Sequence, residues 1–427
     1  MTDDYSLQDM LGTIVSILIL ILAITCHKKT GCWYSPGALF MYLWALIVFF
    51  SSLHLFGMYE VSDRMYFLVL VGSVAFYLGN YKTQVHIKNA GHIDKSERYI
   101  PGYVFFISIV ILVLMQVKPF IQSLLLQASG AELSEIRTEF FEQNKSALQT
   151  LMETITSIFV PLLEAYGLVM FAKDMKKNII YLLSVIVLVG MKSVISGGRW
   201  GIFFLLVELI ICVSLFKKSS LVKYAFKTKF FLVSIIALLV GSIVFVSLQR
   251  GIENEDLVKH YYMYLCGNMV FCDQRLPLLD NWGVFPLSIG LWGLWYLIFP
   301  YLHFFGIPYP PWYSVVSDTV MTTQDTMPIG EDMYMNAFST PFYYLYADTR
   351  WLGIIVGMFL WAKIAGKLYQ RVIIEGSSKS IIFFLLSCQM IFNSIFMFPF
   401  VNTGYVSILI YYFIDRHYID KRKKLVK

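Results

Sequence analysis

Arginine is the residue type in this chain whose placement points most directly to chemistry. We single out five arginines from the segments that we expect on the outer side of a membrane: Arg137, Arg199, Arg250, Arg275 and Arg350. Arg199 stands in SGGRWGIFF, where two glycines lead directly into a helix. A guanidinium beside the free N–H groups of a helix N-terminus suits an oxyanion such as pyrophosphate. The alternative for each arginine is that it reaches toward lipid headgroups or pairs with an outer carboxylate.

The outer-side acids and His260 are the candidate proton acceptors. Asp348 stands alone in sequence just before an apolar run, and Glu253, Glu255 and Asp256 form a cluster. A general base must lie within hydrogen-bond reach of the proton that it takes, and a solvated loop carboxylate is the alternative for each acid. The chain has no HExxH, CxxC, GxSxG or DxD motif and no glycine-rich phosphate loop. We therefore expect dispersed residues to carry any chemistry without a cofactor, and metal ligation by the cluster at 253–256 is an alternative with unspecific spacing.

The composition that must position these residues is that of a membrane protein. Of the 427 residues, 58% are hydrophobic and 15% are charged, against roughly 25% charged in an ordinary soluble domain. This balance excludes a disordered chain, a disulfide-stapled mini-protein and a nucleic-acid binder with one basic face.

Apolar runs long enough to cross a bilayer as helices recur along the chain. The expected spans are 10–25, 36–57, 65–80, 101–117, 151–172, 179–195, 201–216, 230–248, 351–370, 380–398 and 403–414. The predicted fold class is an all-α polytopic integral membrane protein of about 11 transmembrane helices, with 10–14 compatible with the pattern, and residues 1–427 form one membrane domain.

The distribution of charge predicts the orientation of the chain. With these spans, and with Lys367 at the end of its span counted in the adjoining loop, 23 of the 34 Lys+Arg and 6 of the 28 Asp+Glu fall on one side, which therefore carries a net charge of +17. Positive loops stay in the cytoplasm. We expect the N-terminus outside and the C-terminus inside, in the cytoplasmic (inner) membrane of a bacterium.

Two outer stretches break the simple alternation of spans and loops. Residues 127–150 show apolar positions at helical spacing, which predicts an external amphipathic helix or a plain helical spacer. Residues 249–350 form a large external loop with short helices, and an apolar segment near 284–306 is broken by prolines and glycines. We expect that segment to be re-entrant or to lie on the membrane surface.

A few polar residues fall inside the expected spans or pair within the outer loop. Glu164, Glu208 and Lys363 are costly in a bilayer unless they are paired or hydrated, and Glu208 with Lys363 is one candidate ion pair. Cys266 and Cys272 could form a disulfide in an oxidising compartment, although a straight helix would place them on different faces.

Two local patterns and the overall layout carry a resemblance to a known family. The patterns are SGGRWGIFFLL at 196–206 and NAFSTPFYYLYADTRWLGIIVG at 336–357. In the second, the matching positions are Asn336, Phe338, Tyr343, Asp348, Gly353 and Gly357. Together with the large external loop before the last spans, they resemble the bacterial O-antigen and capsule oligosaccharide repeat-unit polymerases of the Wzy type.

The resemblance implies a membrane-embedded, inverting and metal-independent glycosyltransferase. A lipid-linked repeat unit would attack a growing glycan held on undecaprenyl pyrophosphate, at the external face, in O-antigen or capsule biosynthesis. Arg199 with Arg250, Arg275 or Arg350 would stabilise the leaving pyrophosphate, and Asp348 or His260 would take the proton. Arg137, Asn336 and Tyr343 would contact substrate. Membrane lipid, a chain-length regulator and a flippase are the implied partners, and nucleic acid is not.

Other functions fit the same layout. An O-antigen ligase would share the architecture but use the lipid A core as acceptor. A lipid-linked oligosaccharide flippase or another transporter would make no bond, and the long external loop argues against it.

Overall fold

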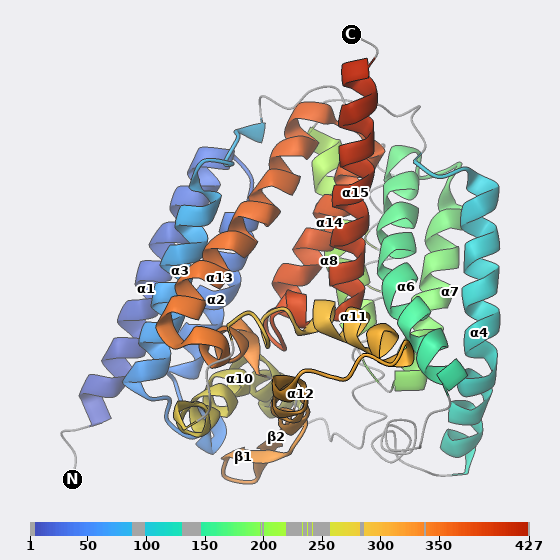
Figure 1. Ribbon diagram of the computed structural model, residues 1–427. Helices are drawn as coiled ribbons and strands as arrows, with labels where there is room; N and C mark the ends of the chain where they lie inside the picture. Colours follow the sequence, from blue (N-terminus) through green and yellow to red (C-terminus); the bar gives the residue numbers. More distant parts are fainter. Residues whose placement is uncertain are drawn as a thin grey trace. The chain divides into compact units, whose positions relative to one another are not determined.

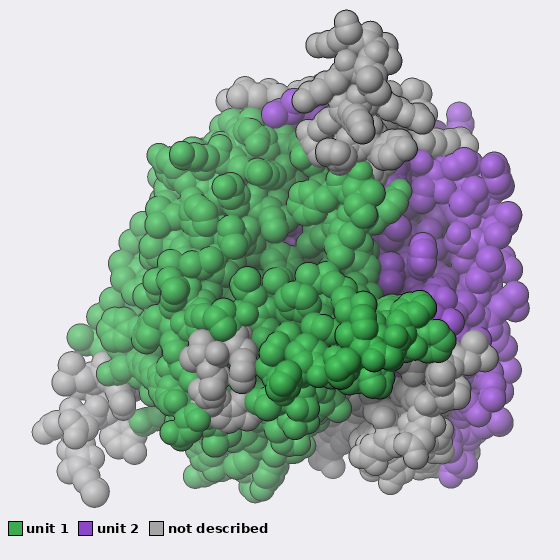
Figure 2. Space-filling view, in the orientation of Figure 1, with its two compact units in different colours: residues 1–89, 258–373, 390–427 green, residues 90–257, 374–389 purple. Residues whose placement is uncertain are grey.

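The computed structural model describes residues 5–87, 99–129, 147–196, 198, 200–218, 257–281, 286–336 and 339–425, together with 233, 237 and 241. The chain forms two compact units (Figure 2). Unit 1 comprises residues 1–89, 258–373 and 390–427, and unit 2 comprises residues 90–257 and 374–389.

Unit 1 begins with three helices that pack on one another: α1 (Tyr5–Thr30), α2 (Pro36–Ser51) and α3 (Asp63–Tyr81). Pro36 starts α2 at a position where its missing N–H costs nothing. Ser62 caps α3 by accepting a hydrogen bond from the Met65 amide. Local signals therefore define where these apolar helices begin.

The later part of unit 1 adds both long and short elements. They are α10 (Leu257–Asp280), α11 (Trp292–Phe304), α12 (Pro311–Thr322), α13 (Thr340–Glu375), a 3₁₀ turn at Pro399–Val401 and α15 (Thr403–Leu425). α11 packs on the 3₁₀ turn and on α15. In Figure 1, α10 and α12 lie at the same end of unit 1 as the start of α1, while α15 ends at the opposite end.

A short hairpin is the β-structure of unit 1 within the described residues. β1 (Met327–Gly330) pairs antiparallel with β2 (Met333–Met335). The amide of Tyr59 donates to the Ile329 carbonyl at 2.9 Å, and that of Glu331 donates to the Gly57 carbonyl at 2.9 Å. The hairpin is thus tied to the connection between α2 and α3, a small addition to an otherwise helical fold.

Unit 2 is a helical bundle of α4 (Gly102–Ala128), α6 (Ala147–Lys173), α7 (Ile179–Ser196) and α8 (Trp200–Lys218), with the first part of α14 (Ser378–Asn393). Figure 1 shows α4, α6 and α7 side by side. Aromatic rings fill the space between them: the Phe105 centroid lies 5.2 Å from that of Tyr166 and 5.0 Å from that of Tyr181.

The helices fall where the apolar runs predict them, and they support a membrane-embedded protein. Within the described part of the chain, four helices are long and apolar enough to cross a bilayer: Met10–Thr30, Gly102–Leu126, Leu151–Lys173 and Thr340–Glu375. Shorter apolar helices cover Pro36–Ser51, Ile179–Ile195, Trp200–Phe216, Ser378–Asn393 and Thr403–Ile414, and α3 covers 65–80. The count of about 11 spans remains a prediction. Nearly all of 230–248 and most of the expected surface helix at 127–150 lie outside the described residues.

Close helix contact in unit 1 depends on glycine. A Cβ at Gly79 of α3 would overlap the Phe359 carbonyl oxygen of α13, and one at Gly366 would overlap the Thr83 hydroxyl. Backbone atoms cannot swing aside as a side-chain end can, so Gly79 sets how near α3 and α13 approach.

Replacing Gly79 with alanine should therefore destabilise unit 1. We expect Gly79→Ala to cost about 1–3 kcal/mol, the range for overpacked cores, and to lower the thermal midpoint of helicity measured by circular dichroism in detergent. Gly190→Ala on α7 is the control, because a Cβ there meets nothing within 4 Å. It should be neutral or stabilising by up to about 1 kcal/mol. Equal midpoints for the two variants would contradict the close contact.

Candidate functional site

A network of arginine, aspartate and tyrosine joins the start of α3 to the end of α10 and the first part of α13. The Arg64 guanidinium donates from Nη1 to Asp280 Oδ2 and from Nη2 to Asp280 Oδ1, both at 2.7 Å. The Tyr346 hydroxyl donates to Asp280 Oδ1 at 2.7 Å and accepts from Arg64 Nη2. The side chains of Arg64 and Asp280 are 32% and 40% exposed, so a ligand can reach them.

Arg350 brings a second guanidinium to this network. Its Nη2 donates to the Leu279 carbonyl oxygen, and its Cζ lies 5.3 Å from the centre of the Tyr346 ring. Arg64 Cζ lies 4.9 Å from the same ring. Two guanidinium charges and one carboxylate leave a net charge of +1, and guanidinium forks suit phosphate oxygens. We call Arg64, Asp280, Tyr346 and Arg350 the arginine network.

A break in α13 places Tyr346 and Arg350 together. Thr349 and Arg350 leave helical geometry, and Arg350 has φ 56°, in the left-handed region that ordinary side chains avoid. A Cβ at Gly353 would overlap the Leu345 carbonyl oxygen, and one at Gly357 would overlap the Leu345 side chain. The two glycines of the 336–357 pattern therefore allow the chain on either side of the break to pack closely.

The structure gives Asp348 backbone partners. Its buried carboxylate accepts from the Ile289 amide at 2.7 Å through Oδ1 and from the Gly290 amide at 2.9 Å through Oδ2. These amides come just before α11, so Asp348 fixes the position of that helix. Gly290 is required beside it, because an added Cβ would meet Asp348 Oδ2.

Arg275 lies in the interior of unit 1, apart from the arginine network. Its Nη2 donates to the Asp325 carbonyl at 3.1 Å, and its Cζ lies 4.6 Å from the Phe271 ring centre. Its Nε is buried with no hydrogen-bond partner in the described part of the chain. The positive charge of Arg275 also interacts electrostatically with the buried side chains of Tyr343 and Tyr344.

His260 and Asn336 lie elsewhere in unit 1. His260 is in the first turn of α10, with its ring centroid 4.6 Å from that of Tyr264. Twenty residues of helix separate it from Asp280, about 30 Å at 1.5 Å per residue. One small reacting centre cannot touch both ends of α10. Asn336 follows β2 directly and is half-buried.

Three predicted arginines and the expected disulfide remain to be placed in the structure. Arg137, Arg199 and Arg250 lie outside the described residues, so their roles remain predictions. Cys266 and Cys272 are buried free thiols on α10, as a continuous helix requires. No group of three or more His, Cys, Asp or Glu suited to a metal occurs among the described residues.

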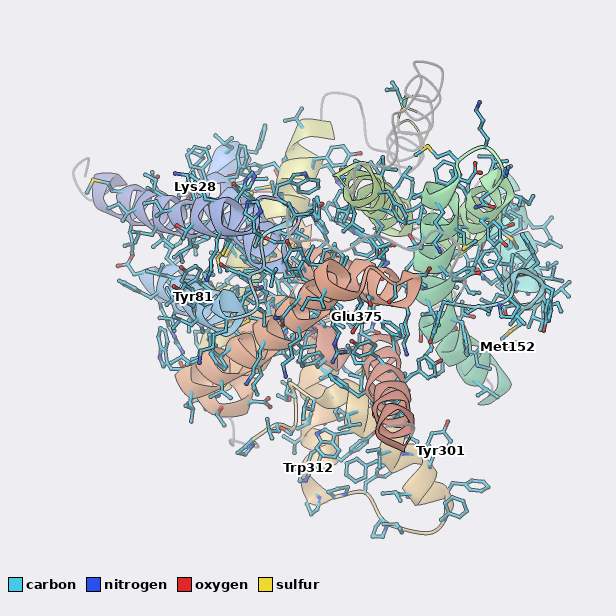
Figure 3. The ribbon with its side chains drawn as sticks, turned by 90° about the horizontal axis from the view of Figure 1, so that it is seen from above. Lys28, Tyr81, Met152, Tyr301, Trp312 and Glu375 are labelled. Atoms are coloured by element: carbon cyan, nitrogen blue, oxygen red, sulfur yellow. The ribbon has the colours of Figure 1, made fainter. Side chains whose placement is uncertain are left out.

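An aromatic layer follows the turn that Asp348 holds. The ring centroids of Trp292 and Tyr313 lie 4.9 Å apart, those of Trp295 and Trp312 6.0 Å apart, and Tyr309 stacks on Tyr313 at 4.6 Å. Figure 3 shows Trp312 and Tyr301 on this α11–α12 segment of unit 1. Such rings offer flat apolar surfaces of the kind that stack on sugar faces or sit at a bilayer interface.

Sequence reasoning missed Arg64, Asp280 and Tyr346. Arg64 stands in the short outer loop between the second and third expected spans, so the argument from retained outer arginines applies to it equally. Asp280 has no such signal, because its partner lies 216 residues away. No protein-family model, curated protein or solved structure matches this chain significantly.

The Arg64–Asp280 pair should couple energetically in a pH-dependent way. The hydrogen bonds from Arg64, more than any other cause, hold the pKa of the Asp280 carboxyl below its ordinary value. The folded state thus favours the carboxylate. That stability is complete above the unfolded pKa, about 3.9, and is lost as the pH falls through the lower folded value.

A double-mutant cycle of Arg64→Gln and Asp280→Asn should give a coupling of about 0.5–1 kcal/mol at neutral pH, which disappears in strong acid. Reversible unfolding in mixed micelles measures it. The control cycle uses Lys177→Gln and Asp174→Asn, a pair at 4.0 Å whose lysine side chain is 85% exposed. Its coupling should be near zero. A coupling at Arg64–Asp280 no larger than this control would show that the pair is not formed.

Proposed function

We propose that the protein is a polymerase of lipid-linked oligosaccharide repeat units. The observation that carries the proposal is the arginine network, where Arg64 binds the Asp280 carboxylate within reach of solvent and Arg350 lies on the same Tyr346 ring as Arg64. A net positive, fork-shaped donor set of this kind supports binding of a pyrophosphate. The resemblance of 336–357 to repeat-unit polymerases covers part of the network, because both Tyr346 and Arg350 lie in that segment.

In this proposal, three parts of unit 1 meet three parts of the substrate. Arg64 and Arg350 bind the pyrophosphate of the undecaprenyl-linked donor. The aromatic layer of α11 and α12 stacks on sugar rings. The apolar helices face the lipid chain in the bilayer, as the membrane character of α1 and α13 supports.

The proposed reaction inverts the configuration of the donor sugar. A hydroxyl oxygen of the acceptor repeat unit attacks the anomeric carbon from the side opposite the pyrophosphate. The bond between that carbon and the phosphate oxygen breaks, and the pyrophosphate leaves on its lipid with the negative charge. The hydroxyl proton passes to a base, and the guanidiniums stabilise the charge that develops on the leaving group.

Asp348 has a positioning role in this scheme. Both of its oxygens already accept a backbone hydrogen bond. It acts by fixing α11 next to the break in α13. The identity of the proton acceptor stays a prediction, as does the role of Arg199 as a further pyrophosphate ligand.

The test is synthesis of glycan by protein reconstituted in vesicles with one lipid-linked repeat unit. We expect a ladder of products from the wild type. Arg350→Gln and Arg64→Gln should each lower the rate by roughly 10²–10³-fold, the usual loss of one transition-state donor. Arg371→Gln is the control: it lies on the same helix, over the Tyr412 ring at 4.9 Å and about 30 Å along the axis from Arg350. Its activity should be close to that of the wild type.

Two results would contradict the proposal. No ladder with the cognate substrate would exclude polymerisation. In cells that lack the protein, free polymer not attached to the lipid A core would indicate a ligase, whereas single-repeat product supports a polymerase.

A further inference from the structure

A buried carboxylate with no hydrogen-bond partner among the described residues lies inside the helical bundle of unit 2. Glu208 of α8 is 1% exposed, and neither of its oxygens has a hydrogen-bond partner among the described residues. Glu164 of α6 is 3% exposed and accepts a hydrogen bond from the Gln389 side chain, which leaves its Oε1 without a partner. The two acids are close enough to interact electrostatically.

The charges around this pair do not balance. Lys192 of α7 is half-buried, and its ammonium group interacts electrostatically with the Glu164 carboxylate. Cys212, one turn beyond Glu208 on α8, is a buried thiol that supplies no positive charge. Two carboxylates beside one ammonium leave one negative charge in excess.

The other basic residues on the packed helices are engaged or distant. Lys173, nine residues beyond Glu164 on α6, donates from Nζ to Ser378 Oγ at 2.6 Å. The described part of α4 carries Lys118 as its charged residue, close to Pro119. Among the described residues, the positive charge shown to act on this pair is that of Lys192.

An uncompensated carboxylate in an apolar interior is costly, and proteins avoid the cost by neutralising it. A metal cation requires several oxygen or nitrogen ligands, and the described residues hold no group of three such acidic, histidine or cysteine side chains. A proton requires one oxygen. The unpartnered oxygens of Glu208 therefore fit a proton better than a metal ion.

We propose that Glu208 is a proton-binding site within the unit 2 bundle, and that it carries an exchangeable proton at neutral pH while Lys192 compensates Glu164. The site is separate from the arginine network and does not depend on the proposed polymerase activity. Loss of the proton would place a second negative charge beside Glu164, so α6 and α8 would repel each other and admit water.

A hydrophobic carbodiimide tests this directly, because it reacts with a protonated carboxyl in an apolar site. The carboxyl oxygen adds to the carbodiimide carbon while the proton moves to its nitrogen, and an acyl shift then gives a stable N-acylurea that retains every atom. Dicyclohexylcarbodiimide should label wild-type protein in vesicles at Glu208 at neutral pH, as mass spectrometry of its peptide would show. Labelling should fall roughly tenfold for each pH unit above the titration.

Matched carboxyls and variants make the result specific. Glu375, exposed at the end of α13 and marked in Figure 3, is the solvent-exposed control and should stay unlabelled. Glu164→Gln removes the like-charged neighbour, so the labelling profile of Glu208 should move to lower pH. Infrared absorption of a buried carboxylic acid C=O should be present in the wild type and lost in Glu208→Gln.

Three outcomes would overturn the proposal. Equal labelling of Glu208 and Glu375 would mean that the site does not select a protonated acid. Protection of Glu208 by sodium ions at constant pH would assign the site to a metal cation. Absence of both the adduct and the infrared band in wild-type protein would show that Glu208 is ionised.

Discussion

The break in α13 at Thr349 and Arg350 is the constraint on which unit 1 depends. It holds an arginine in the left-handed region, a conformation that costs of order 1–3 kcal/mol unless the surroundings support it. Support comes from the bond between the Arg350 guanidinium and the Leu279 carbonyl, and from the close approach that Gly353 and Gly357 permit. Asp348 and Tyr346 stand just before the break. One local feature therefore positions both the carboxylate that binds the start of α11 and the tyrosine of the arginine network.

Polar groups in this apolar chain are used in two distinct ways. In unit 1, carboxylates are occupied: Asp280 by two guanidinium nitrogens and a hydroxyl, Asp348 by two amides. In unit 2, Glu208 has no hydrogen-bond partner within the described residues. Carboxylates with hydrogen-bond partners hold neighbouring elements in place. A carboxylate without such partners in an apolar interior is available to bind a proton. The proposed polymerase site and the proposed proton site follow from this contrast.

The sequence predicts the helices well and the contacts poorly. Long apolar runs have one stable form in a bilayer, so the bounds of α3 and α7 and the start of α15 follow from the sequence, whereas α15 continues to Leu425, beyond the apolar run expected to end at 414. Which side chains meet depends on packing over hundreds of residues, as in the Arg64–Asp280 pair. The candidate ion pair of Glu208 with Lys363 shows the same difficulty. It is not among the ion pairs of the described residues, while Lys192, which acts on Glu164, was not singled out.

The candidate site residues show how far residue type alone predicts a functional position. Arg350 and Asp348 were identified because of their isolation in an outer segment, and both occupy positions that organise unit 1. His260 shares that chemistry but lies at the far end of α10, about 30 Å from Asp280. Residue type indicates what a side chain can do, and only the path of the backbone decides what it can reach.

The bonds from Asp348 to the start of α11 have a mechanical consequence. Asp348 lies two residues from Arg350, so the aromatic helix and the guanidinium are attached to the same short piece of chain. A displacement of α11 would therefore be transmitted through Asp348 to the break in α13, and so to the Arg350 guanidinium.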